Sequence, residues 1–92
     1  MKRACSIRIY GHVFNVGFRR YVHRYATETN VCGYVENDLA DQCVHIEAEG
    51  KQENLNRFIL LCKSGTPYSV ITDVKIEILT TSRNYTDFRQ IR

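Results

Sequence analysis

Residues 11–19 carry the residue types in this chain that are best suited to binding an anion, including Gly11, Gly17 and Arg19. An alternating run precedes this stretch and a helical pattern follows it, so it is predicted to join a strand to a helix. Unpaired N–H groups at a helix start carry partial positive charge, and glycines let the backbone approach a ligand closely. Arginine adds a planar fork of donors that matches phosphate oxygens. The stretch therefore predicts an anion site that suits phosphate, although many strand–helix loops of this composition bind nothing.

A second polar residue, Asn37, ends the second predicted strand. In the predicted sheet the first and second strands run parallel with the third between them, so the glycine loop and Asn37 lie at the same edge. A neutral asparagine is both donor and acceptor and can position a water for attack on a phosphate held by Arg19. Taken alone, Asn37 is more typical of a residue that starts a turn before Asp38.

The elements that position these residues follow the order β-α-β-β-α-β, with a possible short fifth strand. The predicted strands cover residues 4–10, 31–37, 42–49 and 70–80, the predicted helices cover residues 18–29 and 52–63, and residues 85–91 form the possible fifth strand. Each βαβ crossover should be right-handed, and the strands are apolar on one face only. The chain, residues 1–92, is therefore predicted to be one α+β domain, a ferredoxin-like split βαβ sandwich with an antiparallel sheet and two helices on one face.

The third predicted strand alternates, and this pattern bears on nucleic-acid binding. Its inward residues are predicted to be Val44, Ile46 and Ala48, and its outward, exposed residues are predicted to be Cys43, His45, Glu47 and Glu49. RNA-recognition domains share this element order and stack bases on aromatic residues of the two central strands. The outward face of this strand is partly acidic and has no aromatic ring, so a nucleic-acid-binding module is disfavoured.

Composition and cysteine spacing indicate the cellular context and the expected cofactors. The net charge of +3 suits an anionic ligand without requiring nucleic acid. No apolar run approaches the ~20 residues of a membrane span, and the N-terminus lacks the apolar stretch of a signal peptide, so we expect a cytoplasmic monomer. The four cysteines, at positions 5, 32, 43 and 62, have no zinc or redox spacing, so we expect free thiols and neither metal nor cofactor.

Residues 11–19, taken together with residues 32–37, resemble the signature of the acylphosphatase family. That signature reads G-x-V-Q-G-V-G-F-R, followed eighteen residues after the arginine by the asparagine of G-[WY]-x-x-N. Arg19 and Asn37 are separated by the same eighteen residues. Residues 47–50, 64–67 and 86–89 are also similar to the family's pattern, so the resemblance covers nearly the whole chain.

The resemblance implies a small, metal-independent enzyme that hydrolyses acyl phosphates to a carboxylate and inorganic phosphate. Carried over residue by residue, Arg19 resembles the phosphate-binding arginine, and Asn37 resembles the residue that orients the attacking water. The backbone of the loop resembles the family's phosphate cradle. The phosphate-binding residues implied in this way are Val13, Phe14, Asn15, Val16, Gly17, Phe18 and Arg19.

The sequence departs from the family's signature at two positions of the loop. Phe14 stands where the family has glutamine, and Asn15 stands where it has the middle glycine. These changes leave open a weakly active or non-catalytic relative that binds phosphate. The family's fold also occurs as the N-terminal part of a hydrogenase-maturation carbamoyltransferase, where Phe-Arg-Pro is usual. Arg20 follows Arg19 in this chain, which favours the stand-alone enzyme.

Overall fold

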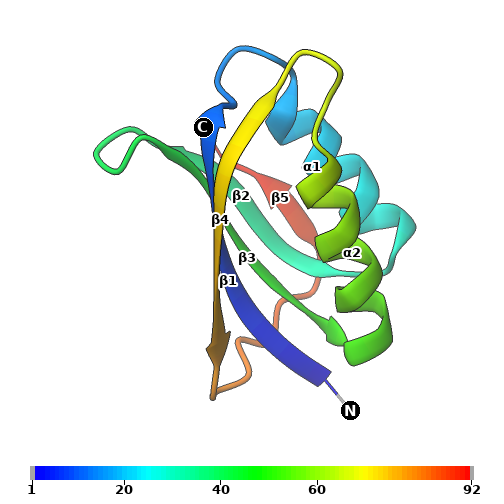
Figure 1. Ribbon diagram of the computed structural model, residues 1–92. Coiled ribbons are helices and arrows are strands. Elements are labelled where there is room, and N and C mark those ends of the chain that lie inside the picture. The colour runs from blue at the N-terminus through cyan, green and yellow to red at the C-terminus, as the bar shows by residue number, and fades with distance from the viewer. Residues whose placement is uncertain (1, 92) are drawn as a thin grey trace.

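A computed structural model describes residues 2–91, which form a five-stranded sheet with two helices on one face (Figure 1). The strands are β1 (Lys2–His12), β2 (Cys32–Asp38), β3 (Cys43–Lys51), β4 (Val70–Leu79) and β5 (Phe88–Gln90), and the helices are α1 (Phe18–Glu28) and α2 (Gln52–Ser64). Every predicted element is present, and most of the predicted ends lie within two residues of the observed ones. No helix among the described residues is both long and apolar enough to cross a membrane.

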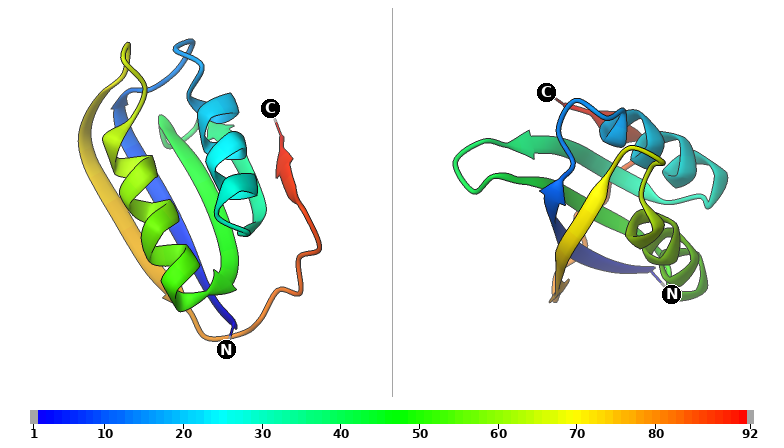
Figure 2. Two further views of the ribbon diagram at one scale, coloured as in Figure 1. Left: turned by 90° about the vertical axis from the view of Figure 1, so that its right-hand side faces the viewer. Right: turned by 45° about the horizontal axis from the view of Figure 1, so that its top comes forward.

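The strand order is β4-β1-β3-β2-β5. Strand β3 lies between β1 and β2 and is antiparallel to both, so β1 and β2 are parallel and end at the same edge of the sheet, as predicted. The short β5 pairs with β2 in parallel, which makes the five-stranded sheet mixed rather than wholly antiparallel. Figure 2 shows how β5 returns from the far end of the sheet to lie beyond β2.

The core lies between the helices and the inward face of the central strands. Its largest buried side chains include Phe18 of α1, Phe58 of α2, and the isoleucines Ile7, Ile9 and Ile46 of the sheet. Helix α1 packs over β2 and β5, whereas α2 packs over β1 and β3. This arrangement holds the first turn of α1 above the end of β2, where Asn37 lies.

Gly11 belongs to β1, so the prediction that it opens the loop is wrong. The register of β1 against β4 shifts between Tyr10 and Gly11, and the strand continues to His12. Gly11 has φ 128°, and a Cβ there would lie 2.0 Å from the carbonyl oxygen of Val70. The glycine is required by this close approach of two backbones. The strand–helix loop therefore comprises residues 13–17.

The face of β3 opposite the helices is largely covered, so the prediction that its residues are exposed is wrong. Cys43, His45 and Glu49 are 0%, 8% and 2% exposed. The His45 ring lies 3.1 Å from Ser6 Oγ through Nε2 and 3.0 Å from Glu36 Oε2 through Nδ1. Side chains of neighbouring strands and a later segment of the chain fold over this face, which the alternation of polar and apolar residues cannot reveal.

Glu49 anchors the segment that joins β4 to β5. Its carboxylate accepts hydrogen bonds from the backbone N–H groups of Arg83 and Tyr85, each at 3.0 Å, and from the hydroxyl of Ser82. Burial alone would raise the pKa of Glu49, but these hydrogen bonds outweigh it and hold the pKa below its ordinary value. The contacts direct the chain back across the sheet, which allows β5 to pair with β2.

Replacing Glu49 by glutamine should lower the free energy of unfolding by about 2 kcal/mol at pH 7. Both oxygens of the carboxylate accept hydrogen bonds, whereas an amide has one acceptor oxygen and would turn its NH₂ group toward a donor. The folded-state pKa of Glu49 is lowered from an ordinary value of 4.5, so its stabilisation is present above that pH and is lost as the pH falls through the folded-state pKa. Urea unfolding followed by circular dichroism should show the difference between native protein and Glu49→Gln shrinking in acid. Glu77→Gln, at an exposed position of β4, is the matched control. A difference that stays constant with pH would contradict the assigned role.

Candidate active site

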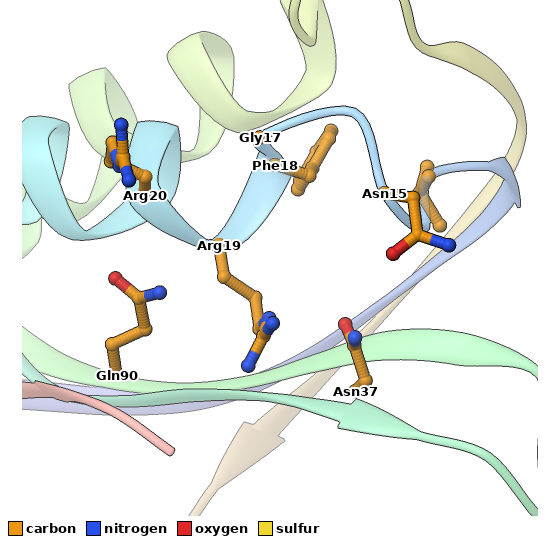
Figure 3. Close-up of a pocket in the computed structure, with 8 residues that line it drawn as sticks. Asn15, Gly17, Phe18, Arg19, Arg20, Asn37 and Gln90 are labelled. Atoms are coloured by element: carbon orange, nitrogen blue, oxygen red, sulfur yellow. The ribbon is translucent and has the colours of Figure 1, made fainter. Parts of the chain in front are cut away.

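A pocket with a volume of about 270 Å³ lies at the sheet edge where β1 and β2 end (Figure 3). It is lined by Val13, Asn15, Gly17, Phe18, Arg19, Arg20, Asn37 and Gln90. Most of the residues predicted for the site from two separate segments of the chain therefore meet in one cavity. The volume is close to the lower end of the ~300–1,000 Å³ typical of small-molecule sites, so it suits a small ligand.

Two residues of the predicted cradle, Phe14 and Val16, do not line the pocket. Their side chains are partly buried against the hydrophobic core, and the Phe14 ring therefore does not fill the cavity. The carbonyl oxygen of Val16 accepts a hydrogen bond of 3.2 Å from the hydroxyl of Thr66, in the connection between α2 and β4. Any role of these two residues in binding phosphate is limited to the backbone, and this role stays a prediction.

The loop turns at two residues with left-handed backbone conformation. Asn15 has φ 59° and Gly17 has φ 75°. Asparagine is the residue after glycine that best tolerates this conformation, so Asn15 keeps the loop shape for which the family's signature uses glycine. The departure at position 15 is therefore accommodated by the backbone.

Asn15→Val should lower the free energy of unfolding by about 1–2 kcal/mol, because a β-branched residue is strained at this φ. Asn15→Gly, which removes the same side chain without that strain, should stay within about 1 kcal/mol of the native protein. Urea unfolding of the three proteins checks this prediction. An equal loss in both variants would show that the asparagine side chain, and not the backbone conformation, stabilises the loop.

The start of α1 offers N–H groups to the pocket. Gly17 precedes the helix without a side-chain cap, and the first turn contains no acidic residue. The Tyr21 N–H donates to the Gly17 carbonyl at 3.1 Å and begins the helical ladder. The preceding N–H groups of the first turn have no partner within the helix, and the helix dipole adds positive potential where they lie.

Arg19 places a positive charge in the pocket beside these N–H groups. Figure 3 shows its side chain extending from the start of α1 into the space between the loop and β2. The lining residues contain no carboxylate, so none of them neutralises this charge. A guanidinium that has no acidic partner among the described lining residues, next to an uncapped helix start, is well suited to an oxyanion such as phosphate.

Asn37 reaches the same space from β2 (Figure 3). Its Oδ1 is buried, and it has no hydrogen-bond partner among the described residues. A buried acceptor without a partner costs about 1–3 kcal/mol, and such groups are found at functional sites. The pocket therefore presents an acceptor, held by a strand, that faces the free donors of Arg19 and can bind a water or another donor.

Two residues of the pocket, Arg20 and Gln90, were not predicted as site residues. The helical pattern assigns Arg20 to the solvated side of α1, and its neighbour Arg19 is the only clue in the sequence. Gln90 reaches the site because β5 pairs with β2, with Gln90 opposite Val35. Nothing in the local sequence around Gln90 indicates this pairing.

A cluster with metal-ligand geometry lies outside the pocket, in the β2–β3 hairpin. The ligand-type atoms of Asp38, Asp41 and Cys43 lie within 4.8 Å of one another. Arg8 Nη1 donates to all three, at 2.9, 3.1 and 3.4 Å respectively, and its hydrogen bond lowers the pKa of Asp38. The guanidinium therefore already supplies the positive charge that a cation would bring, and the cluster is an ion-pair network.

Ser6, His45 and Glu36 form a hydrogen-bonded chain in the order of a Ser-His-acid triad. Ser6 lies in the middle of β1, which pairs with β3 on one side and with β4 on the other. The backbone N–H groups around Ser6 therefore belong to the sheet ladders and cannot form an oxyanion hole. The chain of hydrogen bonds satisfies a buried histidine and does not form a hydrolytic site.

The fold and the pocket define a class of protein: an α+β domain whose pocket, suited to an oxyanion, lies between a strand–helix loop and a neighbouring strand end. The family model described as Acylphosphatase matches residues 5–90. The chain belongs to the acylphosphatase family.

Relatives and solved structures agree with this assignment. The chain is 37% identical to an acylphosphatase of Caldanaerobacter subterraneus subsp. tengcongensis, over 97% of this chain and 98% of that one. It is 42% identical to an acylphosphatase of Thermotoga petrophila, over 94% and 93% of the two chains. The crystal structure of acylphosphatase from Bacillus subtilis matches with a TM-score of 0.90 at 30% identity, and each chain is fully covered.

Full-length HypF in its phosphate- and nucleotide-bound form also matches, with a TM-score of 0.92 and 31% identity. The match covers 100% of this chain but 12% of HypF, whereas the acylphosphatases above match over nearly their whole length. The protein is accordingly a metal-independent hydrolase that converts acyl phosphates to a carboxylate and inorganic phosphate.

Proposed function

We propose that the pocket between the 13–17 loop and β2 is where acyl phosphates are hydrolysed. In this proposal Arg19 and the N–H groups of residues 13–19 bind the phosphoryl group, and Asn37 orients the attacking water. The observation that carries the proposal is that free donors of Arg19 and the unpaired Oδ1 of Asn37 face one pocket at an uncapped helix start.

The chemistry needs little acid–base help. A carboxylate is a good leaving group, and phosphoryl transfer depends mainly on positioning and on stabilising charge at the phosphoryl oxygens. Asn37 Oδ1 accepts a hydrogen bond from the water and turns an oxygen lone pair toward phosphorus. The bond from water oxygen to phosphorus forms while the bond from phosphorus to the acyl oxygen breaks, and the proton lost by the water remains on the phosphate product.

Both departures from the family's signature are compatible with this role. The Phe14 ring packs against the core, and Asn15 adopts the left-handed conformation that the loop needs. Cytoplasmic location belongs to the same proposal and is supported by the four cysteines, which are all free thiols, as is usual in a reducing compartment. The predicted monomeric state stays a prediction.

The test is hydrolysis of benzoyl phosphate in the presence of a chelator, followed by the loss of its ultraviolet absorbance. We expect metal-independent turnover and competitive inhibition by inorganic phosphate. In parallel, amide chemical shifts recorded during a phosphate titration should change most in residues 13–19. Shift changes confined to another part of the molecule would overturn the assignment of this pocket.

A further inference from the structure

The pocket carries one more positive charge than the proposed role of Arg19 requires. Its lining contains the guanidinium groups of Arg19 and Arg20 and the carboxamides of Asn15, Asn37 and Gln90, and no carboxylate is among them. The next arginine along α1, Arg24, differs because it has an acidic neighbour in Glu28, at 3.9 Å. The second charge of the pocket therefore has no acidic partner in its lining and is available to a ligand.

Arg20 and Gln90 lie on the side of Arg19 away from Asn37. Figure 3 shows Asn15 and Asn37 on one side of the Arg19 side chain and Arg20 and Gln90 on the other. Both Arg20 and Gln90 are exposed, so this side of the pocket opens to solvent. Their side chains come from the first turn of α1 and from β5, the two elements that pack against each other here.

The reaction geometry connects this second side with the acyl group. In an in-line displacement, the attacking water and the leaving oxygen lie on opposite sides of phosphorus. If Asn37 holds the water, the bond to the acyl oxygen points away from Asn37, toward Arg20 and Gln90. The acyl group of a bound substrate therefore leaves on the side of Arg19 where these two residues line the pocket.

We propose, resting on the function proposed above, that Arg20 and Gln90 form an acyl subsite that selects acyl phosphates whose acyl group carries a carboxylate or another oxyanion. Arg20 supplies the charge, and the Gln90 amide supplies a neutral donor beside it. The substrate class is thus an acyl phosphate with two anionic ends, one bound at Arg19 and the other at Arg20.

The test compares kcat/KM for benzoyl phosphate with that for 4-carboxybenzoyl phosphate, a rigid pair that differs by one carboxylate. The native enzyme should prefer the carboxylated substrate by about 3- to 10-fold, the range for an exposed charge-assisted contact. Arg20→Gln should lower kcat/KM for 4-carboxybenzoyl phosphate more than kcat/KM for benzoyl phosphate, so that the preference disappears, and Gln90→Leu should reduce the preference in part. Arg24→Gln, which removes an exposed arginine outside the pocket, should leave the preference unchanged.

Two kinetic results would overturn the proposal. The first is a native enzyme without preference between the two substrates. The second is an equal loss on both substrates in Arg20→Gln, since that would place Arg20 on the phosphoryl group. Circular dichroism melting of each variant shows whether a loss reflects misfolding.

A product titration separates failure of the subsite from failure of the proposed function. With inorganic phosphate present, terephthalate should shift the amide signals of Arg20 and Gln90 at lower concentration than benzoate does, and Arg20→Gln should remove the difference. This result would support the subsite even without turnover. Equal responses to terephthalate and benzoate would overturn it whether or not the enzyme turns over.

Discussion

Arg19→Ala should lower kcat/KM for benzoyl phosphate by at least about 10³-fold, because removing even one preorganised donor to developing charge typically costs ~3 kcal/mol. The guanidinium offers several donors, and the described residues that line the pocket include no carboxylate that competes for them. We expect kcat to fall and KM to rise, since Arg19 binds the phosphoryl oxygens in the ground state and also positions the phosphoryl group in the transition state. Steady-state kinetics at several substrate concentrations measure the two separately.

Two further variants define what Arg19 contributes. Arg19→Lys keeps the charge but loses the planar fork, so it should recover part of the activity and remain well below the native enzyme. Arg24→Ala removes an arginine of the same helix that lies outside the pocket, and it should retain native activity. Activity of Arg19→Ala within about tenfold of native would show that the backbone cradle binds phosphate without this side chain.

Asn37→Ala should lower kcat by about 10²–10³-fold and change KM little, because an oriented water contributes to reaction more than to substrate binding. The same substitution should leave the free energy of unfolding unchanged or raise it by about 1 kcal/mol, because it removes a buried acceptor without a protein partner. Loss of activity with no loss of stability is the opposite of what a structural residue shows. Kinetics and urea unfolding on the same preparations provide both measurements.

Asn37→Asp is the matched comparison, since it preserves the shape of the side chain and adds a negative charge. The carboxylate should repel the phosphoryl oxygens, so KM should rise in addition to any fall in kcat. A structural role for Asn37 would give the reverse pattern, with Asn37→Ala destabilised by 2 kcal/mol or more and still active. That outcome would transfer the water-orienting role to another group in the pocket.

The sequence by itself determined the order of the elements and most of the residues that meet in the pocket. Period-two and helical apolar patterns identify β1 to β4, α1 and α2, because these patterns report which face of an element a residue occupies. The parallel relation of β1 and β2 follows from the helical crossover that joins them, and it was enough to place the glycine loop next to Asn37. Local signals and chain connectivity were sufficient for these features.

Only the tertiary structure decided which strand faces are covered by other segments of the chain and which distant residues come into contact. The alternation in β3 places His45 and Glu49 on the side away from the helices, but it cannot show that Ser6 and the segment after β4 cover them. Position 11 requires glycine because the backbone of β4, nearly sixty residues later in the chain, leaves no room for a Cβ. Gln90 enters the pocket because the anchored segment brings β5 beside β2. Each of these contacts joins residues distant in sequence, and such contacts leave no local periodicity by which they could be predicted.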